Sequence, residues 1–187
     1  YLEPHACMVH IDDSGKVQVW ANNKSPFLLR DQLAACLLLK PEQIRINVTN
    51  IGGDFGGKGS SMDVPLCYFL AKASGRPVKM VMNYIDEFIA GNPRHPAVMT
   101  IRSGVKRDGT LLARQGHVVF NSGAYGAFKP SPTANLPGAS ALAGSYRTPN
   151  VRIVADCVYT NTVPCGHMRS PGSPQTNFAV ESHMDMI

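Results

Sequence analysis

The sequence feature that most constrains the fold is a glycine cluster placed directly after an alternating apolar run. Residues 44–49 read Ile-Arg-Ile-Asn-Val-Thr, which predicts a strand, and four glycines lie between positions 52 and 57. Glycine has no Cβ, so this segment can turn tightly and leave backbone N–H groups uncovered. An apolar-periodic segment from Met62 to Ala73 then predicts a helix. The order strand, glycine loop and helix is typical of sites where an anionic group approaches the main chain.

One interpretation of the glycine cluster is a phosphate-binding P-loop. Gly52, Gly57 and Lys58 match the pattern G-x-x-x-x-G-K in the expected strand–loop–helix context. That pattern continues with Ser or Thr, whose hydroxyl holds Mg²⁺, whereas this chain has Gly59, and Ser60 comes one residue late. The mismatch makes a P-loop nucleotide-binding domain the weaker interpretation.

A second interpretation comes from motifs spread along the whole chain. The segment Ile51–Lys58 resembles the G-G-x-F-G-G-K loop of the molybdenum hydroxylases, the family of xanthine dehydrogenase and aldehyde oxidase. Residues 168–175, Met-Arg-Ser-Pro-Gly-Ser-Pro-Gln, resemble the second cofactor loop of that family. Other segments resemble its connecting segments, in the family's order: Tyr1–His5, Ser74–Lys79, Gly91–Pro96 and Tyr146–Asn150. The ordered set is similar to the first molybdenum-cofactor-binding domain of the family's large subunit.

The resemblance implies cofactor-binding roles for Gly53, Phe55, Gly56, Arg169 and Gln175. In the family, the Phe and the Gly at the positions of Phe55 and Gly56 lie over the molybdenum centre, and their backbone N–H groups face the metal's oxygen ligand and the pterin. Arg169 matches an Arg whose main chain approaches molybdenum, and Gln175 either hydrogen-bonds the pterin or caps the following helix. The alternatives are a packed loop anchor for Phe55 and a surface arginine for Arg169. No residue is expected to ligate the metal directly.

Two lysines have open roles. Lys58 could neutralise a phosphate, but a lysine at the start of a helix is more often solvated. In many relatives a Gln occupies the position of Lys24 and faces an oxo ligand of molybdenum. Lys24 therefore either changes the charge near the metal or points elsewhere.

Three features that bind purines in xanthine-oxidising members are absent. Gly59 stands where those members have Glu, and Pro171 stands where they have Phe. Their substrate-orienting Arg falls near Pro137 in a loose alignment, and no Arg stands there. The sequence therefore favours an aldehyde or a simpler aromatic heterocycle over xanthine as substrate.

The resemblance implies a molybdenum-molybdopterin cofactor in a dinucleotide form, and a parent enzyme that hydroxylates an aldehyde, purine or aromatic N-heterocycle with oxygen from water. Expected partners are the remainder of the large subunit, Fe–S and FAD centres on other domains or subunits, and a small-molecule substrate. The family's catalytic base is a Glu in a later Gly-x-Gly-Glu-type segment; Glu3, Glu42, Glu87 and Glu181 lie in no such context. The isolated chain is therefore expected to be inactive. The alternative is a stand-alone binding module with this fold and no cofactor.

Composition narrows the remaining function classes. The chain has 187 residues, of which 44% are hydrophobic and 17% charged, enough for a globular core. The net charge of +5 is scattered and includes no basic run interleaved with aromatics, so no nucleic-acid partner is expected. Five cysteines without a Cys-x-x-Cys pair indicate a reduced, cytoplasmic chain. The longest apolar stretch, residues 27–39, is too short to cross a bilayer, so no membrane partner is expected.

Hydrophobic periodicity predicts a two-layer α+β domain of mixed sheet with helices, covering 1–187 as part of a cofactor-binding domain. The chain starts at Tyr1 and stops within an apolar-periodic segment, so both ends are expected to be truncated. Residues 122–144 are predicted to form either a structureless linker or a functional loop. The expected strands are 5–11, 16–21, 44–49, 77–82, 97–105, 111–121 and 150–161, and the expected helices are one opened by Ser25-Pro26, 62–73, 84–90 and 178–187.

Overall fold

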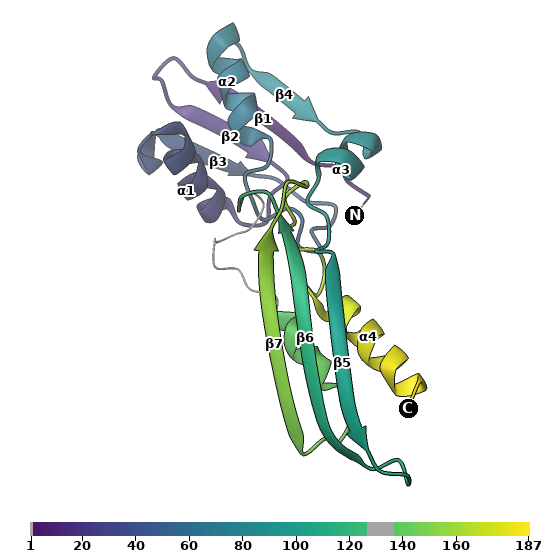
Figure 1. The fold of residues 1–187 in the computed structure, drawn as a ribbon. Helices are drawn as coiled ribbons and strands as arrows, with labels where there is room; N and C mark the ends of the chain where they lie inside the picture. The colour runs from purple at the N-terminus through teal and green to yellow at the C-terminus, as the bar shows by residue number, and fades with distance from the viewer. Residues whose placement is uncertain (1, 127–136) are drawn as a thin grey trace. The chain divides into compact units, whose positions relative to one another are not determined.

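The computed structural model describes residues 2–126 and 137–187, which form two compact units (Figure 1). The first unit contains the described residues up to Gly91, and the second contains those from Asn92 onward. Each unit packs helices against its own sheet, and each sheet is mixed, so the predicted α+β class is confirmed. The assignment of 1–187 to one partial domain stays a prediction.

The first unit is built on a four-stranded sheet in the order β3-β2-β1-β4. The predicted hairpin is present as β1 and β2, and β3 joins β2 in parallel, which brings the strand end before the glycine loop beside the end of β2. Its elements are β1 (Ala6–Ile11), β2 (Val17–Ala21), α1 (Pro26–Leu37), the 3-10 helix η1 (Pro41–Gln43), β3 (Ile44–Val48), α2 (Val64–Ser74), β4 (Val78–Val81) and α3 (Tyr84–Ala90).

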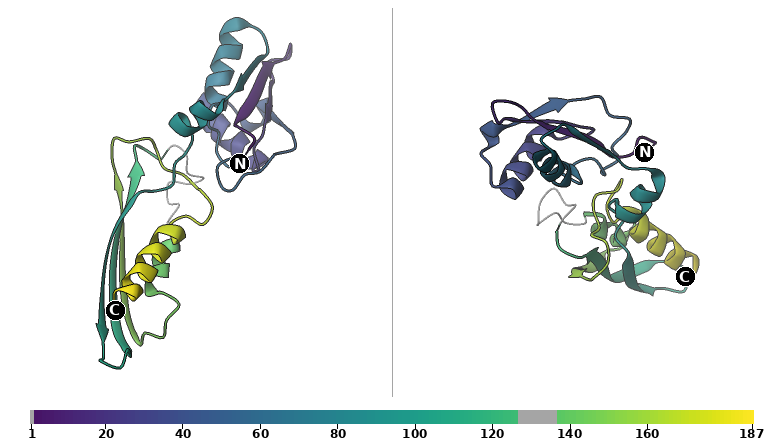
Figure 2. Two further views of the ribbon diagram at one scale, coloured as in Figure 1. Left: turned by 90° about the vertical axis from the view of Figure 1, so that its right-hand side faces the viewer. Right: turned by 90° about the horizontal axis from the view of Figure 1, so that it is seen from above.

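Helices α1 and α2 cover one face of this sheet (Figure 2). Alternate strand residues face them, as a half-buried strand requires, and the fully buried side chains include Val9, Val19, Leu29 and Cys67. Helix α2 begins at Val64 rather than the predicted Met62, with proline in its first turn, and it ends at Gly75 in the left-handed conformation (φ 64°).

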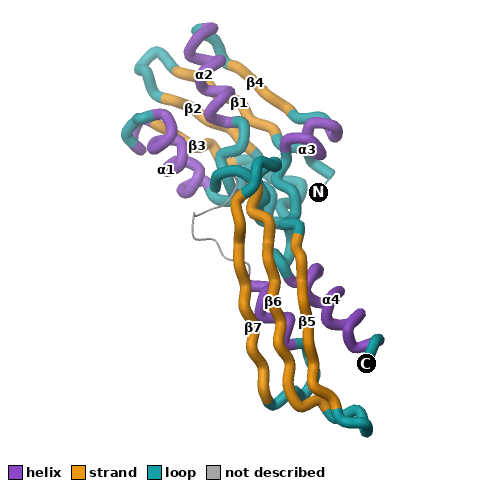
Figure 3. Tube along the Cα trace, viewed as in Figure 1, coloured by secondary structure: helices purple, strands orange, loops and turns teal. Residues whose placement is uncertain are grey.

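The second unit has a three-stranded sheet in the order β5-β6-β7 (Figure 3). The predicted hairpin around the Asp-Gly step is confirmed as the antiparallel pair β5 and β6, and β7 lies parallel to β6. Helix α4 and the 3-10 helix η2 pack on one face, where Val118, Phe120, Leu142 and Val180 form the core. The elements are β5 (Ala97–Val105), β6 (Leu111–Gly123), η2 (Pro137–Ala143), β7 (Asn150–Tyr159) and α4 (Ser173–Asp185).

Two expectations for the second unit need correction. The last helix was expected over 178–187 but begins at Ser173, so Gln175 lies in its first turn rather than before it. Within the region 122–144, residues 137–143 form a 3-10 helix, so that part is not a structureless linker, while 127–136 lie outside the described residues. No helix in the described part of the chain is long and apolar enough to cross a membrane.

Candidate cofactor site

The first predicted cofactor loop joins β3 to α2 and turns at two glycines. Gly53 and Gly56 have φ angles of 103° and 102°, a conformation that only glycine adopts readily, and Phe55 between them has a φ of 47°. Phe55 is 47% exposed, so part of it is accessible at the surface of this unit. The backbone therefore needs glycine at both positions whatever the loop binds.

Asp54 closes the first loop. Its carboxylate accepts hydrogen bonds from the backbone N–H groups of Gly56 and Lys58, each at 2.8 Å, and from Lys24 Nζ at 2.9 Å. Partial burial alone would raise the pKa of Asp54, but these hydrogen bonds outweigh it and hold the pKa below its usual range. The ionised carboxylate of Asp54 therefore orders the loop. The stability that it contributes is lost only when the pH falls toward the lowered pKa of Asp54.

The Asp54 contacts change the role that Gly56 can have. The resemblance implies that the Gly56 N–H faces a cofactor oxygen, whereas in this structure that N–H donates to Asp54 Oδ2. What Gly56 offers to a ligand is thus its missing side chain and its turn geometry. The cofactor role of Gly56 stays a prediction on that basis.

Lys58 is buried, so the prediction of a solvated lysine is wrong. The residue is 1% exposed, and its Nζ lies 2.5 Å from Glu3 Oε2. The hydrogen bond from Lys58 holds the pKa of Glu3 below its usual range, so the pair is ionic. A P-loop lysine must present its ammonium group to phosphate. The engagement of Lys58 with Glu3 therefore argues against the P-loop interpretation.

Lys24 lies against the first loop. Its ammonium group pairs with Asp54, and its side chain is 45% exposed. A Cβ placed on Gly59 would stand 3.1 Å from Lys24 Cε, tighter than most real contacts. Lys24 therefore occupies space next to Gly59, the position where xanthine-oxidising members are expected to carry Glu.

The second predicted loop is held by the segment that precedes β5. Arg94 donates from Nη2 to the carbonyl oxygen of Arg169 at 2.9 Å and from Nη1 to that of Ser170 at 3.3 Å. Asn92 donates from Nδ2 to the carbonyl oxygen of His167 at 3.0 Å. Arg169 itself is exposed. The bracing role of Arg94 was missed, because a connector motif gives no signal of which distant carbonyls its arginine will reach.

Gln175 presents an acceptor that suits a ligand with N–H donors. Its Nε2 donates to the carbonyl oxygen of His95 at 2.7 Å, which fixes the orientation of the amide. Its Oε1 is buried and has no hydrogen-bond partner among the described residues. A buried acceptor left unpaired costs free energy, so a donor from a bound group is expected there. A pterin carries ring N–H and amino groups, which are donors of the kind that this acceptor lacks.

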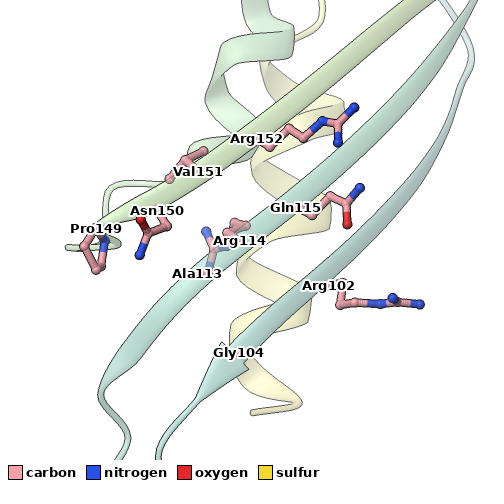
Figure 4. Close-up of a pocket in the computed structure, with 9 residues that line it drawn as sticks. All are labelled: Arg102, Gly104, Ala113, Arg114, Gln115, Pro149, Asn150, Val151 and Arg152. Atoms are coloured by element: carbon pink, nitrogen blue, oxygen red, sulfur yellow. The ribbon is translucent and has the colours of Figure 1, made fainter.

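One hollow in the first unit lies next to a predicted cofactor loop, whereas one hollow on the second unit does not. A hollow of about 370 Å³ in the first unit is lined by Glu3, Trp20, Thr49 and Asn50, among others, and so reaches the strand end that leads to the glycine loop. A hollow of about 570 Å³ on the second unit contains none of the predicted site residues. Figure 4 shows it, with Arg102, Gln115 and Arg152 extending from three neighbouring strands.

Replacement of Arg94 by Met is expected to loosen the second loop. The variant keeps an unbranched side chain but removes two charge-assisted hydrogen bonds to the loop. We expect the loop to lose about 1 kcal/mol of stability against local opening, which corresponds to about fivefold faster hydrogen exchange. Hydrogen exchange over residues 168–172 is the measurement, and Arg102→Met on the exposed face of β5 is the control. Equal protection of the loop in both variants would show that Arg94 does not hold it.

Comparison with known proteins places the chain in a family. The profile of the molybdopterin cofactor-binding domain matches residues 1–187, and the chain belongs to that family. It is 34% identical over its full length to a probable xanthine dehydrogenase subunit of Bacillus subtilis, covering 25% of that protein. It is 31% identical over its full length to the nicotinate dehydrogenase large molybdopterin subunit of Eubacterium barkeri, covering 44% of it.

A solved structure shows the same fold. The aldehyde oxidoreductase from Desulfovibrio gigas matches 98% of this chain with a TM-score of 0.84 and 32% identity, and the match covers 20% of that protein's chain. The chain thus spans between a fifth and less than half of the length of these relatives. The family assignment made from the ordered motifs is confirmed.

Proposed function

We propose that the chain supplies both loops of a molybdenum-molybdopterin site in a larger molybdenum hydroxylase. The observation that carries the proposal is the buried acceptor of Gln175, which lies in the first turn of α4 at the end of the second family motif and has no hydrogen-bond partner among the described residues. When bound, this cofactor supplies two-electron oxidation of a substrate carbon.

Each loop has a distinct task in this proposal. Gly53, Phe55 and Gly56 form a backbone surface without a bulky side chain at the glycines, so a planar group can approach closely. Gln175 Oε1 accepts from the pterin and fixes its orientation. Arg169 adds positive charge at the second loop, and the net charge of +5 suits the anionic dinucleotide form of the pterin.

The parts that this chain lacks belong to the remainder of the protein. No glutamate of the chain lies in the motif expected for the catalytic base. We propose that the base, the Fe–S and FAD centres that take the electrons, and the rest of the pterin pocket are supplied by the remaining large subunit and its partners. The reduced cysteines suit a cytoplasmic location.

The isolated 187-residue chain is expected to fold and to oxidise no aldehyde, purine or N-heterocycle. A proton acceptor near the substrate is required for the reaction, and none is expected here. Molybdenum and pterin content and turnover are measured for the full-length protein and for the isolated chain side by side. Cofactor in the full-length protein supports the proposal, whereas a full-length protein without pterin would support the binding module. Turnover by the isolated chain would contradict the inactivity expected of it.

The substrate is proposed to be an aldehyde or a simple aromatic heterocycle. Gly59 offers no carboxylate, and Lys24 occupies the adjacent space. Pro171 offers no aromatic ring, and its carbonyl oxygen accepts a hydrogen bond from the Gly138 N–H at 3.2 Å, so the position near Pro137 lies beside it. Neither of these two positions in the second unit thus carries the Arg or the Phe expected of a xanthine-oxidising member.

We expect the full-length enzyme to prefer benzaldehyde or nicotinate over xanthine by at least about a hundredfold in kcat/KM, which corresponds to about 2.7 kcal/mol. A site without the polar partners of a purine loses orders of magnitude in efficiency toward it. Steady-state kinetics with xanthine, hypoxanthine, benzaldehyde and nicotinate make the comparison. A clear preference for xanthine would refute the substrate assignment.

A further inference from the structure

We propose that Glu3 and His5 are positioning residues that fasten the N-terminal segment across the first cofactor loop and set the geometry of its ligand-facing backbone. The inference rests on the proposed function, because it names what holds the loop that would carry the cofactor. It assigns a role to Glu3 and His5, for which the motifs gave only a resemblance to a connecting segment.

Glu3 ties the two ends of the loop to one carboxylate oxygen. Its Oε2 accepts from the Gly52 N–H at 2.7 Å and from Lys58 Nζ at 2.5 Å. A Cβ on Gly52 would stand 2.9 Å from Glu3 Cβ, so the Glu3 side chain occupies the space that any other residue at position 52 would need. The Lys58 side chain is fully buried, and this carboxylate supplies it with a counter-charge.

His5 holds the middle of the same loop. Its Nε2 lies 3.1 Å from the carbonyl oxygen of Gly57, and its Nδ1 lies 2.9 and 3.0 Å from the two carboxylate oxygens of Glu87. The backbone N–H of His5 also donates to Glu87. Both ring nitrogens thus face oxygen atoms that accept hydrogen bonds. The residue is 4% exposed, so water does not replace these contacts.

The energetic reason for such a clamp lies in the loop itself. Gly53, Phe55 and Gly56 all have positive φ angles, and a glycine-rich segment loses much conformational entropy when it is fixed. Contacts that reach the loop from Gly52 to Lys58 offset that entropy without using the surface of Phe55. Removal of the clamp should therefore widen the range of loop conformations before it unfolds the unit.

Hydrogen exchange on the cofactor-free, full-length protein tests the clamp. His5→Leu is expected to accelerate exchange about tenfold over residues 52–58 and to leave α1 (Pro26–Leu37) at wild-type protection. Glu3→Ala also lowers the stability of the whole unit, so it is expected to accelerate exchange over residues 52–58 about tenfold more than over α1. His5→Gln should restore part of the protection, because its amide can still donate to Gly57. His10→Leu on β1, at a half-buried histidine outside these contacts, is the matched control. Pterin retention is then compared for the same variants.

The outcomes separate the clamp from the proposed function. Faster exchange in the loop, with reduced pterin retention, supports the clamp. Unchanged exchange over 52–58, or equal acceleration in α1, would overturn it, since the residues would then act only on the stability of the whole unit. Wild-type pterin retention with a loosened loop would also overturn it, because the loop geometry would not matter to the ligand. If the variants loosen the loop but the wild-type full-length protein itself binds no pterin, the clamp stands and only the proposed function is refuted.

Discussion

Gly56→Val is expected to reduce the molybdenum content of the full-length enzyme to below about a tenth of wild type, because positive φ and close backbone approach both exclude a β-branched residue. Gly56 has a φ of 102°, so valine there is strained by about 1–3 kcal/mol. The added methyl groups also stand on the surface that the cofactor is proposed to approach. Metal content per protomer is the measurement.

Gly15→Val is the control for the strain alone. Gly15 has a φ of 79° in the turn between β1 and β2, and a Cβ there would meet no atom within 4 Å. We expect a similar loss of stability in this variant and normal loading. Near wild-type loading in a folded Gly56→Val protein would show that the loop does not contact the cofactor.

The second large effect is expected at the ion pair between the buried Lys58 and the partly exposed Glu3. Glu3→Ala should destabilise the first unit by about 2 kcal/mol, because it removes the carboxylate that accepts a charge-assisted hydrogen bond from the buried Lys58 ammonium group. The double variant Glu3→Ala/Lys58→Met should be more stable than Glu3→Ala alone, since the methionine side chain needs no counter-charge. Trp20 is the single tryptophan and lies on β2, so its fluorescence during denaturant unfolding of the 187-residue chain reports on this unit.

Asp31→Ala is the matched control for that pair. Asp31 pairs with Arg30 at 2.8 Å, but both side chains are substantially exposed, and such a pair contributes less than about 1 kcal/mol. If Glu3→Ala costs no more than Asp31→Ala, the Lys58 pair does not stabilise the unit. If the double variant is less stable than Glu3→Ala, the loss of the counter-charge of Lys58 does not explain the destabilisation.

Local sequence patterns were sufficient to predict the strands that flank the candidate site. Alternation predicted β3, and the Asp-Gly step predicted the β5–β6 hairpin, because both signals depend on residues close in sequence. The start of α4 could also have been predicted, since Ser173-Pro174 repeats the Ser25-Pro26 pattern that opens α1. The later start that was expected led Gln175 to be placed before the helix instead of in its first turn.

The partners of the charged side chains were not accessible from the sequence. Lys58 and Glu3 are 55 positions apart, and Arg94 reaches carbonyl groups 75 and 76 positions away. Such contacts depend on tertiary packing, and no local pattern specifies them. The family motifs singled out both segments along the chain but gave no information on how each segment is held.

A structure of the full-length enzyme loaded with its cofactor is the most direct test of the central claim that these two loops bind molybdopterin. The expected result is a pterin whose N–H groups lie within hydrogen-bonding distance of Gln175 Oε1 and whose metal end lies over the backbone of Phe55 and Gly56. A cofactor seated elsewhere, with Gln175 Oε1 paired to a protein group, would contradict the claim.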